Sequence, residues 1–269
     1  MDNLYVIKGQ IQQVYAKYSK FIDKGVQFIL ALAVFYMINH DLGFMSLLSN
    51  PLITVGLAVI CAFLPMIVTV LAAAVLILVQ MAAVSLGIMA VTAVVFVIMF
   101  VFYVRFSPKT AVVILLMPLA FMFHIPYVIP VAFGLVGTPA SVVPVICGTV
   151  VYYMIDYVKT SASALESGGA EGMISQLMTY LQQVFQNREM IVMILAFVIG
   201  LFLVYQIRRM SVSHAWKSAS AAGAVAGIVI VAAGSAVLDV KVSYPELILG
   251  NVAAVIVGLI LELLFFAVD

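Results

Sequence analysis

The sequence predicts an all-α polytopic integral membrane protein, a helix bundle in which proline and glycine break some helices. Three observations predict this fold class. Hydrophobic residues make up 66% of the 269 residues, charged residues only 9%, and the mean hydropathy is +1.28, whereas a soluble domain carries about 25% charged residues. Uncharged stretches long enough to span a bilayer follow one another along the chain. Prolines interrupt these stretches, and in lipid the backbone groups that they free must be shielded by protein or water.

Residues 1–24 predict an amphipathic helix that lies on the cytoplasmic membrane surface. Apolar residues recur there at helical spacing, and Lys8, Lys17, Lys20 and Lys24 lie among the polar residues between them, a combination that suits an anionic surface. The segment lacks the short apolar core and cleavage site of a signal peptide. Residues 25–39 then form a first short span.

The membrane region 25–158 contains two long uncharged runs, of 63 residues after Asp41 and of 46 residues after Lys109. Within them the units 50–104 and 107–158 share a layout: a polar residue and a proline, an interior proline, and a long closing helix. An opening arm of about 14 residues spans only about 21 Å, too short for a hydrocarbon core of about 30 Å. We therefore expect a half-helix or a re-entrant hairpin in each unit.

The shared layout predicts an inverted repeat. If each unit crosses the membrane an odd number of times, the second unit is inverted relative to the first, as in many secondary transporters. The alternative is that two hydrophobic stretches of similar length share a proline by chance.

The stretch FMFHIPYVIPVAFGLVGTPASVVP, residues 121–144, predicts two helix breaks, one near 124–126 and one near 134–139. Five of the nine prolines fall within residues 118–144, and each removes a backbone donor and frees a carbonyl. Gly134 and Gly137 suit a loop tip, and Ser141 is placed to cap the following helix. Either the breaks line a substrate path or they are structural kinks buried among neighbouring helices.

His124 is the histidine that falls within an expected span, and an ionisable group inside a membrane is a functional hypothesis by default. A buried structural imidazole is the alternative. Asp156, near Lys159, indicates either an interfacial ion pair or a gate. The hypothetical substrate path comprises Pro65, Thr69, His124, Pro126, Pro130, Gly134, Gly137, Ser141 and Asp156.

The remaining segments follow in order. Residues 159–189 predict an extracytoplasmic loop, SASALESGGAEG, and then a Gln-rich amphipathic helix on the outer surface. Residues 190–269 predict a C-terminal membrane region of three helices. In it, Gly223 and Gly227 form a GxxxG pattern, which we interpret as helix packing within the bundle rather than as a dimer face. The chain ends as the last helix leaves the membrane, so a longer parent protein with a cytoplasmic tail is an open expectation.

The positive-inside rule favours a bacterial cell-membrane protein with both termini cytoplasmic. This topology places nine of the 12 lysines and arginines inside and three outside. It gives six full crossings and two shorter broken elements, or ten crossings if each repeat unit crosses three times.

The chain shows none of the sequence motifs of an enzyme. It has no GxxxxGK[ST], HExxH or GxSxG motif and no cluster of metal-ligating residues, so we expect no catalysis, cofactor or metal site. Cys61 and Cys147 lie in apolar runs and are interpreted as packing residues. The composition also argues against nucleic-acid binding.

The N-terminal YVIKGQIQQVYAKYSKFIDK and the hydrophobic body that follows resemble uncharacterised polytopic membrane proteins of Gram-positive anaerobes. The resemblance covers most of the chain and implies no function. We expect a transporter or channel for a small solute, with broken helices near 65 and 124–139 lining the path. The alternative is a non-catalytic membrane-embedded scaffold, either a homo-oligomer or a subunit bound to a partner membrane protein. The scarcity of charges in the spans disfavours a strongly ionic solute.

Overall fold

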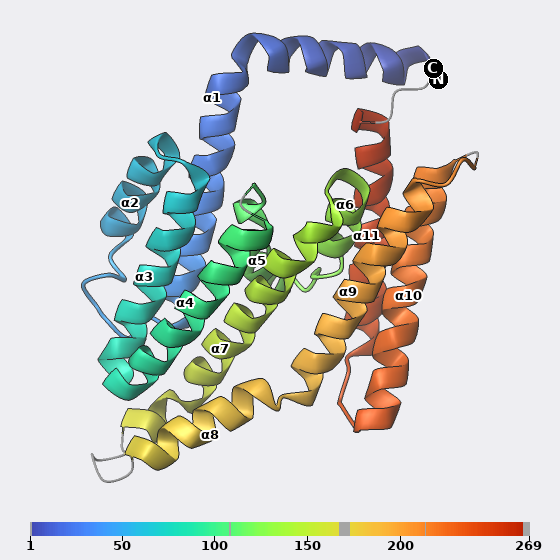
Figure 1. Ribbon diagram of the computed structural model, residues 1–269. Helices are drawn as coiled ribbons and strands as arrows, with labels where there is room; N and C mark the ends of the chain where they lie inside the picture. The colour runs from blue at the N-terminus through green and yellow to red at the C-terminus, as the bar shows by residue number, and fades with distance from the viewer. Residues whose placement is uncertain (1, 108, 167–172, 213, 266–269) are drawn as a thin grey trace.

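The computed structural model describes residues 2–107, 109–166, 173–212 and 214–265. Within these ranges the chain forms eleven α-helices and one 3-10 turn, and no strand (Figure 1). Seven helices are long and apolar enough to cross a membrane. The protein is therefore an all-α polytopic membrane bundle, as the composition predicts.

The first helix, α1 (Asp2–Asp41), bends where the chain passes from an arm across one end of the bundle into the bundle itself (Figure 1). Tyr18 has non-helical dihedral angles (φ −121°, ψ 18°). The Tyr15 hydroxyl donates to the Asp23 carboxylate across the bend at 2.8 Å. We call the part before Tyr18 the N-terminal arm. The end of the bundle at which this arm lies is called the N-terminal face, and the other end is called the opposite face. The bend thus falls within the expected surface segment 1–24.

The first uncharged run folds into three helices, α2 (Pro51–Phe63), α3 (Met66–Val84) and α4 (Leu86–Phe106). Asn50 caps α2 by accepting a hydrogen bond from the Leu52 amide at 3.0 Å. The first break falls at Pro65, as predicted. A second break, at Ser85 (φ −157°, ψ 122°), separates two long helices and was not predicted. The structure accordingly has seven long helices rather than six full crossings, and the run still passes through the bundle an odd number of times.

The second run folds into α5 (Ala111–Met122), α6 (Val128–Val136), the 3-10 turn η1 (Pro139–Ser141) and α7 (Val142–Glu166). Both predicted breaks, near 124–126 and near 134–139, are confirmed. The Ser107 hydroxyl before α5 donates to the carbonyl of Ala140 after α6. Because these two ends meet, α5 and α6 form a helical hairpin (Figure 1).

The remaining helices are α8 (Met173–Phe185), α9 (Arg188–Arg208), α10 (Ala215–Leu238) and α11 (Tyr244–Phe265). The expectation of a loop over 161–172 is wrong for its first six residues, because α7 continues to Glu166; residues 167–172 lie outside the described residues. The sequence SASALE is compatible with helix because its alanines, leucine and glutamate are good helix formers.

The helices alternate in direction, so that α11 ends at the N-terminal face, where the N-terminal arm lies (Figure 1). The loops between α4 and α5 and between α9 and α10 lie at this face too, and the loop between α10 and α11 lies at the opposite face. The cations therefore divide as the charge rule predicts. The N-terminal face carries Lys8, Lys17, Lys20, Lys24, Arg105, Lys109, Arg208, Arg209 and Lys217, and the opposite face carries Lys159, Arg188 and Lys241.

Helix α6 is enclosed by α9, α10 and α11, which approach it closely through glycines. A Cβ added at Gly134 of α6 would lie 2.8 Å from the Cβ of Val204, and one added at Gly250 would lie 2.8 Å from the Tyr127 ring. Added Cβ atoms would also clash inside the bundle at Gly223, with Val204, and at Gly227, with Asn251. The predicted internal role of the GxxxG pattern is confirmed.

Candidate functional site

The turn between α5 and α6 is a helix terminus built around a histidine. The Ile125 amide donates to the Ala120 carbonyl at 2.9 Å and the His124 amide donates to the Phe121 carbonyl at 3.0 Å. This pair of bonds is a Schellman motif, in which the residue before the last donor adopts a left-handed conformation and is usually glycine. His124 takes that place with φ +57°, and Pro126 then prevents the helix from continuing. The turn thus satisfies the backbone groups that the break would otherwise leave free.

A cavity of about 210 Å³, the hairpin pocket, lies against this turn. Its polar lining comes from α5–α6, α7, α9 and the start of α11 with the loop before it: His124, Tyr127, Tyr152, Glu189, Lys241, Ser243 and Glu246. The side chains of His124 and Glu246 are 68% and 55% exposed, so the pocket is open. His124 Nδ1 lies 3.4 Å from Glu246 Oε2, an ion pair when the ring is protonated.

Glu189 supplies a second carboxylate from the first turn of α9. Its Oε1 accepts a hydrogen bond from the Tyr153 hydroxyl at 3.1 Å, and Asn187 caps the helix by accepting from the Met190 amide at 3.2 Å. The N-terminus of a helix favours an anionic side chain. Glu189 is therefore an acidic side chain at a helix N-terminus beside the pocket, held by the hydroxyl of Tyr153.

Aromatic rings form the inner wall of the pocket. Phe121 stacks on Tyr152, with ring centroids 4.3 Å apart and planes 9° apart. Phe197 meets Phe121 and Tyr127 edge-on at 5.8 and 5.7 Å. The hydroxyl of buried Tyr127 contacts the Met193 sulfur at 3.5 Å. The pocket thus combines a charged mouth with an aromatic and apolar floor, the usual character of a small-molecule site.

The structure distributes the other predicted path residues over the hairpin and its far end. Pro126 lines the pocket, whereas Pro130 and Gly134 lie within α6 and are buried against neighbouring helices. Gly137 and Ser141 lie at the N-terminal face, where the Arg208 guanidinium donates to the Gly137 carbonyl at 3.1 Å. The expected cap by Ser141 is wrong: its buried hydroxyl has no hydrogen-bond partner among the described residues, because the 3-10 turn runs directly into α7.

The break at Pro65 lies apart from the hairpin pocket and is closed by a side chain from α1. The Gln27 amide donates to the carbonyls of Cys61 and Leu64, each at 2.8 Å, and to the Thr69 hydroxyl at 3.2 Å. These bonds satisfy backbone carbonyls at the break. The geometry of Pro65 and Thr69 therefore has a structural explanation.

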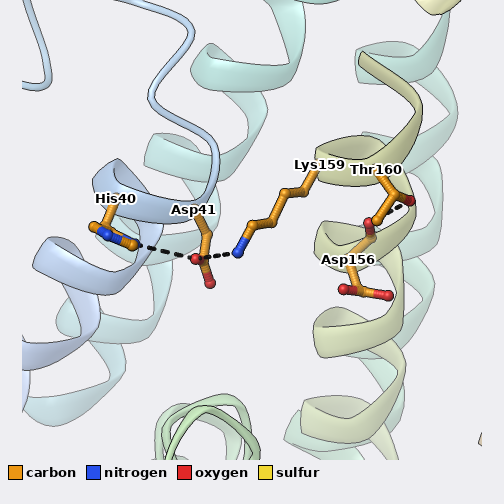
Figure 2. Close-up of polar contacts among 5 residues, drawn as sticks. All are labelled: His40, Asp41, Asp156, Lys159 and Thr160. Atoms are coloured by element: carbon orange, nitrogen blue, oxygen red, sulfur yellow. Dashed lines mark hydrogen bonds and ion pairs between the residues drawn. The ribbon is translucent and has the colours of Figure 1, made fainter. Parts of the chain in front are cut away.

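Asp156 lies on α7 toward the opposite face, near an ion pair that it does not join (Figure 2). Lys159 Nζ lies 2.7 Å from Asp41 Oδ1 at the end of α1, and the His40 ring lies 3.3 Å from the same oxygen. The Asp156 backbone carbonyl accepts from the Thr160 hydroxyl at 2.9 Å. The expected partner of Lys159 is thus corrected from Asp156 to Asp41, because Lys159 extends across to the neighbouring helix.

Sequence reasoning missed Glu189, Lys241 and Glu246 as site residues. The charge rule used Lys241 only to orient the chain, and all three residues lie in or next to the short connections before α9 and α11. Glu189 and Glu246 each stand directly before an uncharged span and near a helix start, and that position is the one local signal available. That all three share one pocket with His124 depends on how α9 and α11 pack against the hairpin.

A larger cavity of about 310 Å³ lies between α1, α3, α4, α5 and α7. Its described lining carries no charged side chain, and it includes Cys147, Val151 and Pro118. Such a cavity is suited to apolar contacts but offers a polar solute little to bind. Among the described residues, no group of three or more His, Cys, Asp or Glu side chains is placed to hold a metal ion.

Comparisons with protein-family models, with curated proteins and with solved structures found no match to this chain.

Proposed function

We propose that the chain is a membrane transporter for a small solute, which binds in the hairpin pocket. The observation that carries this proposal is an open cavity with charged groups at the His124–Pro126 break. In a purely structural kink, the free backbone groups need hydrogen-bond partners. The Schellman motif supplies these partners, so the break itself does not require a cavity. Broken helices around a polar site are typical of secondary transporters, which bind their substrates there.

The α5–α6 hairpin is, in this proposal, the re-entrant element that exposes the pocket alternately to the two sides. Its turn borders the pocket, and its two ends meet at the N-terminal face. Helix α6 contacts its neighbours largely through glycines and apolar side chains such as Val131, Val204 and Leu135. Smooth contacts of this kind let one helix shift against another without breaking hydrogen bonds, as in shear motions.

The charge distribution supports a bacterial cell membrane with the N-terminal face, and hence both termini, in the cytoplasm. Nine of the 12 lysines and arginines lie at that face. The pocket would then open to the outside. The inverted repeat of 50–104 and 107–158 fits the same proposal, because each unit contains three helices and the two run in opposite directions (Figure 1).

A scaffold role is the second candidate, and the exposed apolar face of α8 favours it. Ile174 and Met178 are 77% and 59% exposed there, so the helix offers an apolar surface to either lipid headgroups or a partner protein. A scaffold needs no water in the hairpin pocket. Access of water to the pocket therefore separates the two candidates.

The test is uptake by proteoliposomes that contain the full chain, with solutes screened against protein-free vesicles. We expect uptake of the active solute to require the His124 ring, because that ring lines the pocket together with Glu246, Glu189 and Lys241. His124→Gly should lower the rate of uptake, since glycine keeps the left-handed turn and removes the ring.

His214→Gly is the matched control. His214 has the same left-handed conformation, φ +64°, but lies in the loop before α10 at the N-terminal face. It should leave the rate of uptake unchanged. An unchanged rate in His124→Gly would remove His124 from the mechanism, and the absence of uptake of every screened solute would contradict transport.

A further inference from the structure

The hairpin pocket contains a carboxylate and an ammonium that the protein leaves available. His124 and Glu246 face each other at 3.4 Å, whereas Glu189 is bound by a neutral tyrosine hydroxyl. Lys241 is exposed and makes no hydrogen bond or ion pair within the described part of the chain. Two opposite charges therefore border one cavity of about 210 Å³ without neutralising each other.

The wall between these charges suits an apolar body. Phe121 and Tyr152 present stacked rings, and aromatic faces attract both apolar groups and ammonium groups. Apolar side chains complete the lining: Val192, Met193, Val231, Val240, Val242 and Leu247. A ligand that fits has an ammonium, a carboxylate and a small apolar or aromatic group.

The sparse charge of the spans agrees with such a ligand. A solute with a large net charge would need compensating charges along its way across the membrane, and only 9% of the residues are charged. A zwitterion has no net charge, and its two ends are matched by Glu189 and Lys241. Charge complementarity of this kind also weakens the binding of solutes that carry only one of the two groups.

We infer that the hairpin pocket binds a zwitterionic amino acid with an apolar or aromatic side chain, its ammonium at Glu189 and its carboxylate at Lys241. The inference rests on the proposed transport function, for which it names the class of solute. The presence of the two charged groups and of the Phe121–Tyr152 stack in the lining of one cavity is what supports it.

Equilibrium binding to the purified full chain in lipid nanodiscs tests the inference with three probes of one shape. They are phenylalanine, phenethylamine, which lacks the carboxylate, and 3-phenylpropionate, which lacks the ammonium. We expect phenylalanine to bind at least about tenfold more tightly than either analogue, because each analogue leaves one charge of the pocket unpaired.

Two variants should divide the probes. Glu189→Gln is expected to weaken phenylalanine and phenethylamine binding by about tenfold and to leave 3-phenylpropionate unchanged. Lys241→Met should weaken phenylalanine and 3-phenylpropionate and leave phenethylamine unchanged. Glu262→Gln and Lys217→Met remove the same types of charge away from the pocket and should change nothing. Retained binding of the unaffected probe shows in each case that the variant is folded.

The outcomes separate this inference from transport itself. Binding of phenylalanine with the divided pattern supports the solute class, even if proteoliposomes take up no phenylalanine and transport fails. Uptake of another solute without phenylalanine binding overturns the class and leaves transport standing. Equal loss of all three probes in either pocket variant, or no effect of either, also overturns the inference.

Discussion

At the scale of single residues, His124 shows most clearly how local geometry and function coincide. A left-handed conformation costs an L-residue about 1–2 kcal/mol relative to the right-handed one, and glycine at the same place would avoid that cost. The histidine nevertheless directs an imidazole toward Glu246 at the mouth of an open cavity. Backbone strain retained beside a pocket points to function, which is why the hairpin turn carries the proposal.

Gln27 is the residue on which the break between α2 and α3 depends. Gln27→Leu would leave the carbonyls of Cys61 and Leu64 without their donor. We expect the free energy of unfolding in detergent micelles to fall by about 1–3 kcal/mol, the cost of unsatisfied buried polar groups. Reversible denaturant unfolding followed by circular dichroism measures this change.

Gln183→Leu is the control for that substitution. Gln183 lies on the exposed side of α8, so the same change in side chain should alter the free energy of unfolding by less than about 0.5 kcal/mol. Equal effects of the two substitutions would show that Gln27 does not hold the break together.

At the scale of elements, the hairpin could be predicted in part. Proline and glycine act locally, so residues 121–144 predicted both of its breaks. The side chains that complete the pocket could not be predicted, because Glu189 and Glu246 share a cavity with His124 only through the packing of α9 and α11. The length of α7 was underestimated because the serines of SASALE suggest a loop, whereas the helix incorporates them.

The packing of α8 against the bundle rests on a buried hydrogen bond between Tyr180 and Thr92 of α4, 2.8 Å long. We expect Tyr180→Phe and Thr92→Val each to lower the free energy of unfolding by about 1–3 kcal/mol, since each leaves a buried hydroxyl unpaired. The double variant should lose less than the sum of the two single losses. A double-mutant cycle in detergent measures this coupling.

Strict additivity of the two losses would contradict a direct bond between α4 and α8. Thr179→Val is a suitable control on the same helix, because the Thr179 hydroxyl bonds only to the Ser175 carbonyl of its own helix. It should not couple to Thr92→Val.

At the scale of the whole molecule, the distribution of charge predicted at which face the helix ends lie better than it predicted the number of long helices. Lysine and arginine mark the ends of helices. The sequence could therefore predict that each uncharged run passes through the bundle an odd number of times. The division of α3 from α4 could not be predicted, because Ser85 lies inside a stretch without charge or proline. The division of this stretch into two long helices accounts for seven long helices instead of six full crossings.

Two cavities within the described part of the bundle differ in a way that belongs to the molecule as a whole. The larger one lies among α1, α3, α4, α5 and α7 and is apolar, and the smaller one lies at the hairpin turn and is charged. Water should enter only the second. Both cavities border α7, with Cys147 in the first and Tyr152 in the second. A cysteine at either position of this one helix therefore reports on the access of water to one of the two cavities.

Thiol accessibility in intact vesicles is therefore the most direct test of a solute site at the hairpin turn. With Cys61 and Cys147 replaced by alanine, Tyr152→Cys and His124→Cys should react with a membrane-impermeant thiol reagent added at the opposite face, and phenylalanine should slow the reaction. Native Cys147, in a chain that lacks only Cys61, should stay unreactive from either face. If Tyr152→Cys and His124→Cys are as unreactive as Cys147, the hairpin pocket is dry and the proposal of transport through it is wrong.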